Sequence, residues 1–126
     1  MISVKMSDVF NASDALAELG KCSLSGKSAF AVARLIREVD NEMKTFETIR
    51  MDIIRKYADK DENGELILEE GNIHLSEENV TACNNELMDS LAQIIELNAN
   101  PLKYEWLEKI ELTVPQAMAL EPFMEE

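Results

Sequence analysis

The chain has 126 residues, of which 46% are hydrophobic and 29% are charged, and its formal net charge is -13. This length suits one domain with one core. No apolar run reaches the ~18 residues that cross a bilayer, and no signal-peptide pattern opens the chain, so we expect neither membrane insertion nor secretion. The negative charge argues against direct nucleic-acid binding, which requires a positive surface.

The negative charge lies almost entirely in the second half of the chain. Residues 1–58 carry eight acidic and nine basic side chains, whereas residues 59–126 carry seventeen and three. No Lys or Arg occurs between Asp61 and Asn100. Such a segment is typical of a solvated, solubilising face or of a surface that attracts a basic partner. The candidate partner-binding residues are Asp61, Glu62, Glu65, Glu69, Glu70, Glu77 and Glu78.

The first 28 residues predict short elements. The loose alternation of residues 1–10 favours a short strand or an extended arm. Asn11 or Ser13 would cap a short helix that ends at Gly20. The string GKCSLSGKS resembles a phosphate loop, but five residues instead of four separate its glycines. We interpret it as an interhelical loop with Ser25 as the next N-cap.

A long helix is predicted from Ser25 to about Ala58. Its seam residues recur at spacings of three and four, the heptad pattern of a helix packed lengthwise on another helix. The polar member of the seam, Arg50, would extend to solvent or pair with Glu86 or Asp89, and we favour the ion pair. The seam consists of Ala29, Val32, Ile36, Val39, Met43, Phe46, Arg50, Ile53 and Tyr57.

Residues beyond this helix predict a hairpin and two further helices. ELILEEGNIHL, residues 65–75, predicts a small β-hairpin that turns near residues 70–72. Ser76 would cap an amphipathic helix that continues to about Asn98. Thr113 and Gln116 have capping-box spacing, which opens a last short helix through Phe123. The expected fold is a single α+β domain over residues 1–126, mostly helical, with a long antiparallel helical hairpin and a small β-hairpin or sheet attached. The second helix has the seam Val80, Cys83, Leu87, Leu91 and Ile94.

DKDENGELILEE, residues 59–70, fits the calcium-binding EF-hand string D-x-D-x-N-G-x5-E. However, Gly71 and Asn72 follow where the exiting helix should continue, and Ile67 replaces the usual polar residue at position nine. We therefore expect a polar turn between helix and hairpin, and no tight calcium binding. The ligand positions of the calcium alternative are Asp59, Asp61, Asn63 and Glu70.

No residues have the spacing of a catalytic site. His74 lies among hairpin residues without a neighbouring nucleophile, and we interpret it as a partly exposed strand histidine. Cys83 lies on an apolar seam, where a free cysteine acts as a small hydrophobic residue. With one histidine and no CxxC spacing between Cys22 and Cys83, the usual zinc sites and a disulfide scaffold are excluded. We expect no catalytic residue, no metal and no cofactor.

The long seam also predicts self-association. It presents more apolar length, about 50 Å, than a second helix of about 30 Å can cover. Unless the short terminal helices cover the rest, the uncovered stripe would form a homodimer interface. The stripe would consist of Leu35, Val39, Met43, Phe46 and Ile49, with Arg34, Arg37, Lys44 and Arg55 near the acidic half of a second copy.

A family pattern runs along the long helix and the turn after it. Residues 31–66 contain Phe46-Glu47 and Arg50 in mid-helix, then Tyr57 and a DENG turn, and residues 120–126 read LEPFMEE. In these features the chain resembles small proteins encoded by bacteriophages and prophages of Gram-positive hosts. Members commonly have Gly at the position of Ala58 and a neutral or Glu residue near Asp59, so the calcium string resembles the family's ordinary turn with one coincidental Asp. The resemblance implies a phage origin and the cytoplasm of a bacterial host, and it implies no activity.

These observations predict a non-catalytic phage or prophage accessory protein that acts by protein binding. The favoured form is an acidic inhibitor of a host nucleic-acid-targeting defence factor, of the anti-CRISPR or anti-restriction type, whose basic surface the acidic half would bind. The first alternative is a phage assembly or structural protein that self-associates through its long helix. The second alternative is a single EF-hand-like calcium-binding domain.

Overall fold

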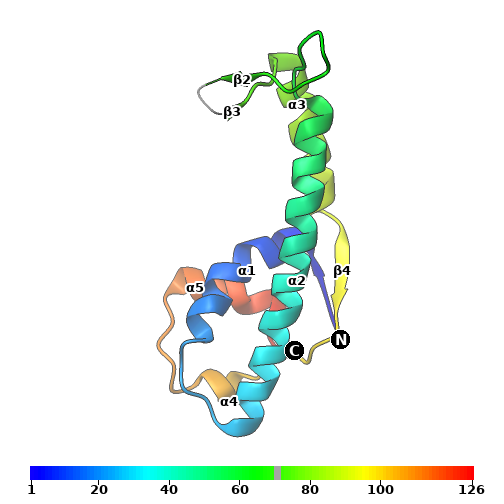
Figure 1. The fold of residues 1–126 in the computed structure, drawn as a ribbon. Coiled ribbons are helices and arrows are strands. Elements are labelled where there is room, and N and C mark those ends of the chain that lie inside the picture. The colour runs from blue at the N-terminus through cyan, green and yellow to red at the C-terminus, as the bar shows by residue number, and fades with distance from the viewer. Residues whose placement is uncertain (70–71) are drawn as a thin grey trace. The chain divides into compact units, whose positions relative to one another are not determined.

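The computed structural model describes residues 1–69 and 72–126. The protein is 61% helical with two-stranded antiparallel sheets, which confirms the mostly helical α+β class (Figure 1). The chain divides into two compact units: unit 1 is Met1–Lys44 with Ala92–Glu126, and unit 2 is Thr45–Leu91. Helix α2, Gly26–Tyr57, supplies its first part to unit 1 and its second part to unit 2. Division into two compact units does not tell whether each unit folds on its own. The single domain over residues 1–126 therefore stays a prediction.

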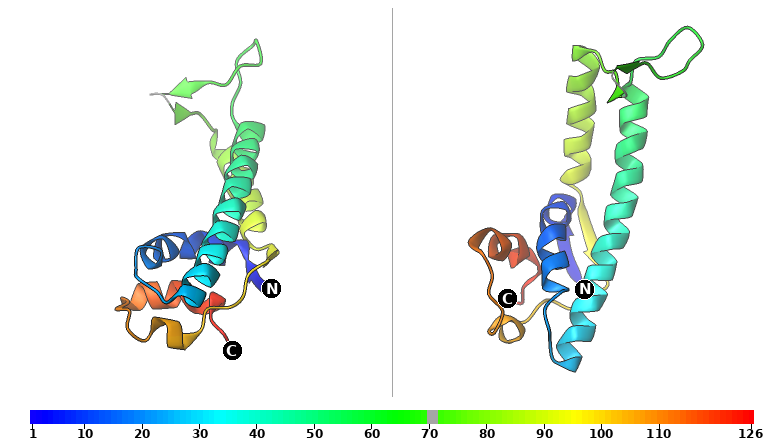
Figure 2. Two further views of the ribbon diagram at one scale, coloured as in Figure 1. Left: turned by 60° about the horizontal axis from the view of Figure 1, so that its bottom comes forward. Right: turned by 60° about the vertical axis from the view of Figure 1, so that its left-hand side comes forward.

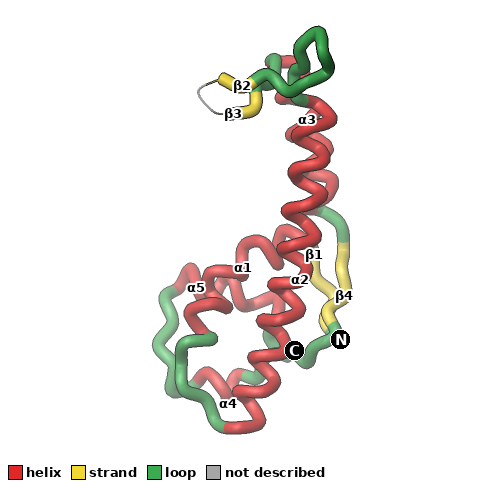
Figure 3. The backbone as a smooth tube through the Cα atoms, viewed as in Figure 1, coloured by secondary structure: helices red, strands yellow, loops and turns green. Residues whose placement is uncertain are grey.

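Unit 1 begins with a strand that pairs with a distant segment. Strand β1, Ile2–Lys5, pairs antiparallel with β4, Ile94–Leu97, and Figure 3 shows the two side by side. Ile2 and Val4 are buried while Ser3 and Lys5 are exposed, the alternation of a strand with one covered face. Helix α1, Met6–Leu19, follows directly and buries its apolar stripe.

The end of α1 and the start of α2 are shaped by small residues. A Cβ at Gly20 would lie 3.1 Å from Cδ1 of Ile36, so the missing side chain permits close approach of the two helices. The backbone carbonyl of Ser25 accepts from the amide of Ala29, and its hydroxyl lies 2.9 Å from that of Ser28. The interhelical loop and the start of α2 near Ser25 are thereby confirmed.

The C-terminal elements complete the core of unit 1. They are α4, Tyr104–Leu107, α5, Val114–Leu120, and a 3-10 turn, Glu121–Phe123. The predicted capping box is present, since Thr113 accepts from the amide of Gln116 and the Gln116 side chain accepts from the amide of Thr113. Amide-to-carbonyl bonds of 2.8 Å, from Leu102 to Phe123 and from Glu125 to Leu102, join the tail to the segment after β4. The largest fully buried side chains are Phe123, Leu16, Leu19, Leu35, Leu97, Leu102 and Leu120.

Unit 2 contains the second part of α2, a hairpin and a second helix. Strands β2, Leu68–Glu69, and β3, Asn72–Ile73, pair antiparallel, which confirms the predicted β-hairpin; its turning point at residues 70–71 lies outside the described residues. Helix α3, Glu77–Leu91, begins after Ser76 with two acidic residues in its first turn, where the helix dipole stabilises negative charge. It runs antiparallel to the end of α2 (Figure 2). Among the described residues of this unit, the buried ones are Phe46, Ile53, Ala58 and Cys83.

Three expectations require correction. Helix α1 begins at Met6, so Asn11 and Ser13 lie within it, because its first turn is closed by the Lys5 amide donating to Asp8. Helix α3 ends at Leu91, and Ile94 belongs to β4 at 72% exposure, because pairing with β1 overrides the helical pattern.

The third correction concerns the apolar stripe of the long helix. Leu35, Val39 and Phe46 are at most 4% exposed within the single chain, whereas Ile49 is 41% exposed. The first three of these residues therefore serve as core and do not form the exposed stripe that the spacing predicted, while self-association itself stays a prediction. No helix of the described chain is long and apolar enough to cross a membrane.

Candidate functional site

The turn after α2 is held by one carboxylate. Oδ1 of Asp61 accepts from the backbone amides of Asn63 and Glu65, at 2.9 and 3.0 Å. Gly64 has a φ of 80°, a left-handed conformation that L-residues with side chains adopt at a cost. The DENG turn is therefore formed by Asp61 as a side-chain acceptor and Gly64 as the residue that permits the sharp reversal.

A polar cluster ties this turn to the hairpin and to α3. Oδ2 of Asp59 lies 2.6 Å from Nδ1 of His74, and its Oδ1 accepts from the Asn79 side chain at 3.2 Å. The backbone adds a bond from the Asp59 amide to the His74 carbonyl. Asp59 is the less exposed partner, with 23% of its side chain accessible against 41% for His74. The sequence predicted a partly exposed strand histidine; His74 is partly exposed, but it lies directly after β3 and links the end of the hairpin to Asp59.

Glu86 of α3 holds the end of α2. Its Oε1 accepts from Nζ of Lys56 at 2.8 Å and from the Tyr57 hydroxyl at 3.4 Å. The hydrogen bond to Glu86, and then its charge, raise the pKa of Lys56 above its ordinary value. The predicted ion pair of Arg50 with Glu86 or Asp89 is wrong: Arg50 pairs with Glu47, one turn earlier on its own helix.

Most of the other described carboxylates of unit 2 are exposed. Besides Asp61, six exposed carboxylates of this part of the structure have no cation within ion-pair distance among the described residues. One is Asp52 on α2, and the other five follow α2 in the chain and mostly belong to the predicted partner-binding set. Asp61 of that set is used partly by the turn, Glu69 is placed only as part of β2, and Glu70 lies outside the described residues. We call these five the acidic surface: Glu62, Glu65, Glu77, Glu78 and Asp89.

Two of the predicted calcium ligands, Asp59 and Asp61, already accept hydrogen bonds within the protein. Both oxygens of Asp59 are engaged by His74 and Asn79, and Oδ1 of Asp61 is engaged by backbone amides. The chain after the turn forms β2 and not the exiting helix that an EF-hand requires. Within the described residues, no group of three or more His, Cys, Asp or Glu side chains could hold a metal ion.

The two cysteines occupy different environments. Cys83 is 3% exposed on α3, as its place on the predicted seam indicated, and burial, followed by the charge of Glu86, raises the pKa of its thiol. Cys22 is exposed in the loop between α1 and α2. A buried thiol with a raised pKa stays protonated at neutral pH, so Cys83 is suited to packing and not to nucleophilic chemistry.

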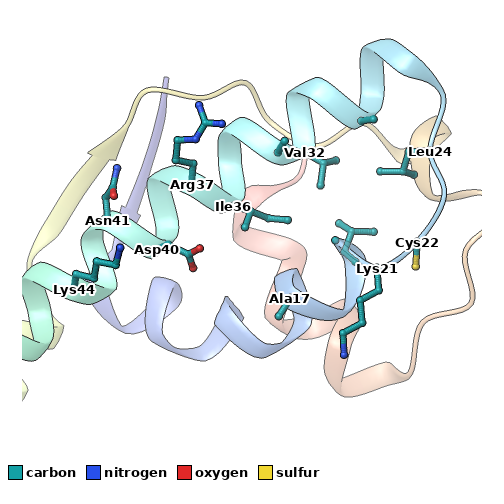
Figure 4. Close-up of a pocket in the computed structure, with 14 residues that line it drawn as sticks. Ala17, Lys21, Cys22, Leu24, Val32, Ile36, Arg37, Asp40, Asn41 and Lys44 are labelled. Carbon is teal, nitrogen blue, oxygen red and sulfur yellow. The ribbon is translucent and has the colours of Figure 1, made fainter.

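A hollow of about 560 Å³ lies in unit 1 between α1 and the first part of α2. In Figure 4, Ile36, Asp40 and Lys44 line it from α2, and Ala17 faces them from α1. Lys21, at its rim, pairs with Glu18 at 3.1 Å. The wall combines small and apolar side chains with charged side chains of the surface, which is the lining of a gap between two helices.

Comparisons of the chain with protein-family models, with curated proteins and with solved structures find no match. The features of the molecule that bear on function are the acidic surface and the hydrogen bonds of Asp59, Asp61 and Glu86 that hold its backbone.

Proposed function

We propose that this chain is a non-catalytic phage or prophage accessory protein that acts by binding another protein through the acidic surface. The observation that supports the proposal is a set of exposed carboxylates, unpaired by cations among the described residues, on a backbone held by Asp59, Asp61 and Glu86. Of the described acidic residues that follow α2, Asp59, Asp61 and Glu86 hold the backbone, and the five of the acidic surface are available for binding. A fixed frame lowers the entropy that binding would cost.

The chemistry of this surface selects a basic partner. Unit 2 holds twelve acidic and four basic residues, and two of the four bases pair with Glu47 and Glu86. Spaced negative charge of this kind attracts the cationic surfaces that proteins use to bind nucleic-acid phosphates. We infer that the partner is a nucleic-acid-handling protein of the bacterial host, such as a defence factor, whose binding groove the acidic surface would occupy.

Competition with nucleic acid tests this proposal. The tagged protein is incubated with host lysate, and captured proteins are challenged with increasing salt and with duplex DNA or RNA. We expect a captured basic protein that nucleic acid displaces and that elutes at moderate salt, because exposed charge contacts are screened. The test variant carries Gln or Asn at all five positions of the acidic surface, and its capture should fall at least about tenfold.

A matched control separates position from total charge. It removes five exposed acidic side chains of unit 1, so both variants have the same net charge. If both variants lose capture equally, or if nucleic acid fails to displace the bound protein, the proposal is wrong. The control positions are Asp14, Glu96, Glu105, Glu111 and Glu126.

Calcium binding remains the alternative that the turn sequence suggests, and we expect none that is tight. A calcium ion would have to displace His74 and Asn79 from Asp59 and the amides from Asp61. Isothermal titration should show no micromolar binding. Micromolar affinity that disappears in Glu70→Gln would establish the calcium-binding function instead.

A further inference from the structure

A second hollow in unit 1 is apolar, with an acidic rim. It has a volume of about 460 Å³ between α4 and α5, and Leu107, Leu112 and Met118 line it with Glu108 and Glu121. In Figure 1, α4 and α5 follow each other along the chain and are joined by a loop. Met118 is 67% exposed, so the groove is open and its apolar wall meets water.

The chain around this groove is strongly acidic. Residues 104–126 contain six acidic residues and one base, Lys109. Lys103, just before α4, lies 5.8 Å from the ring centre of Trp106 and is stacked there. The groove therefore fits a large apolar group that basic side chains accompany.

The start of α2 presents a group of that kind. Phe30 is 81% exposed, the most exposed of the large apolar side chains described in the chain. Lys27 and Arg34 lie one turn before and after it on the same helix face, and Arg37 follows one turn further. Residues 26–37 contain these three bases and no acid. A hollow of about 320 Å³ beside Phe30, flanked by Arg34 and Arg37, leaves room for a side chain from another molecule.

We propose that the α4–α5 groove binds the Phe30 face of a second copy of this chain. Phe30 would enter the apolar groove while Lys27 and Arg34 meet Glu108 and Glu121 at its rim. The two surfaces are complementary, because each is apolar at its centre and their charges are opposite. The net charge is +3 over residues 26–37 and -5 over residues 104–126. Phe30 does not occupy the groove of its own chain, as its exposure shows. The contact is independent of the acidic surface of unit 2.

This contact is small, so the association is weak. One aromatic anchor and a few rim charges belong to the size class of transient interfaces, and we expect a dissociation constant of roughly 100 μM. Sedimentation equilibrium between roughly 20 μM and 1 mM covers that value. The average mass should rise above 14.2 kDa with concentration, and rise less at high salt.

Two single variants and a control identify the surfaces. Phe30→Gln and Met118→Lys should each weaken association at least about tenfold, because the first removes the anchor and the second places a cation in the groove. Met88→Gln, at another exposed apolar side chain of 67% exposure on α3, should leave association unchanged. Circular dichroism confirms that all three remain folded.

Mixing the two weakened variants distinguishes this contact from other forms of self-association. The Phe30→Gln chain keeps its groove and the Met118→Lys chain keeps its Phe30, so the mixture should form a one-to-one complex that neither forms alone. A wild-type chain that stays monomeric at 1 mM overturns the proposal, and a basic peptide that binds the groove of such a monomer would identify a foreign partner instead. Equal loss in Met88→Gln, or a mixture that fails to associate, overturns it as well.

Discussion

The two units of this chain are stabilised in different ways. Unit 1 buries large apolar side chains from nearly every element, whereas the buried set in the described part of unit 2 is Phe46, Ile53, Ala58 and Cys83. Unit 2 instead relies on polar contacts that converge on Asp59, Asp61 and Glu86. The charges differ too, with thirteen acidic and eight basic residues in unit 1 against twelve and four in unit 2.

This difference indicates that unit 1 supplies most of the stability of the fold, whereas unit 2 exposes the acidic surface. A fully buried apolar side chain contributes more to the free energy of unfolding than an exposed polar contact does. A small unit can therefore carry many unpaired charges if it is attached to a larger apolar core. Substitutions in unit 1 should change stability most, and substitutions in unit 2 should change local order.

The largest expected effect is in the core of unit 1. Phe123 is 0% exposed, and Phe123→Ala should lower the free energy of unfolding by about 3–5 kcal/mol through lost burial and the cavity left behind. Urea unfolding followed by circular dichroism measures the change. Phe30→Ala is the matched control, because the same substitution at 81% exposure should have almost no effect at low protein concentration. Equal losses in the two variants would contradict this view of unit 1.

A smaller and local effect is expected at Asp59. Asp59→Ala removes the acceptors of His74 and Asn79 and should cost about 1–2 kcal/mol, because two donors lose their partner in a partly exposed site. Hydrogen exchange should increase in residues 59–79 and stay unchanged in α1. Glu62→Ala serves as control, since Glu62 is exposed. Faster exchange throughout unit 1 would show that the units are not stabilised separately.

How far the sequence predicted the fold depended on where each element's partner lies. The starts of α2 and α3, the capping box of α5, the DENG turn and the β-hairpin use residues that are close in sequence, and local rules identified them. Strand β4 was missed because Ile94–Leu97 pairs with β1 from the other end of the chain. Its alternation is short, and only the distant partner selects strand over helix.

The candidate site divides in the same way. The acidic composition of unit 2 was visible directly, and Glu62, Glu65, Glu77 and Glu78 are exposed as a binding surface requires. The pairing of Asp59 with His74 and of Lys56 with Glu86 spans 15 and 30 residues and has no sequence signal of its own. Arg50 illustrates the limit: its place on the seam suggested a partner on α3, but Glu47 at i−3 is nearer.

The turn gives the next smaller effect. Gly64→Ala should cost about 1 kcal/mol because a Cβ is strained at a φ of 80°. Gly64→Asn should cost less, since Asn tolerates this conformation. Hydrogen exchange at the amides of Asn63 and Glu65, which donate to Asp61, reports the turn directly. Equal protection in all three proteins would mean that Gly64 is not needed for the turn.

The smallest effect concerns Lys56 and its dependence on pH. The partner Glu86 raises the pKa of Lys56 in the folded protein above the ordinary 10.5. Because the folded pKa is raised, the pair adds its full stability at pH values below the pKa of Lys56 in the unfolded chain. This gain disappears as the pH rises through the folded pKa. Lys56→Met should therefore unfold slightly more easily than wild type between pH 7 and about pH 10, and equally easily above the folded pKa. Since the Lys56 side chain is 60% exposed, the difference at pH 7 should also shrink in high salt. Parallel urea titrations of the two proteins, from pH 7 to above the folded pKa and at low and high salt, test the pH dependence and the salt dependence. A difference that persists unchanged at high pH would assign the effect of Lys56 to packing on Tyr57, whose ring centre lies 5.1 Å from Nζ of Lys56.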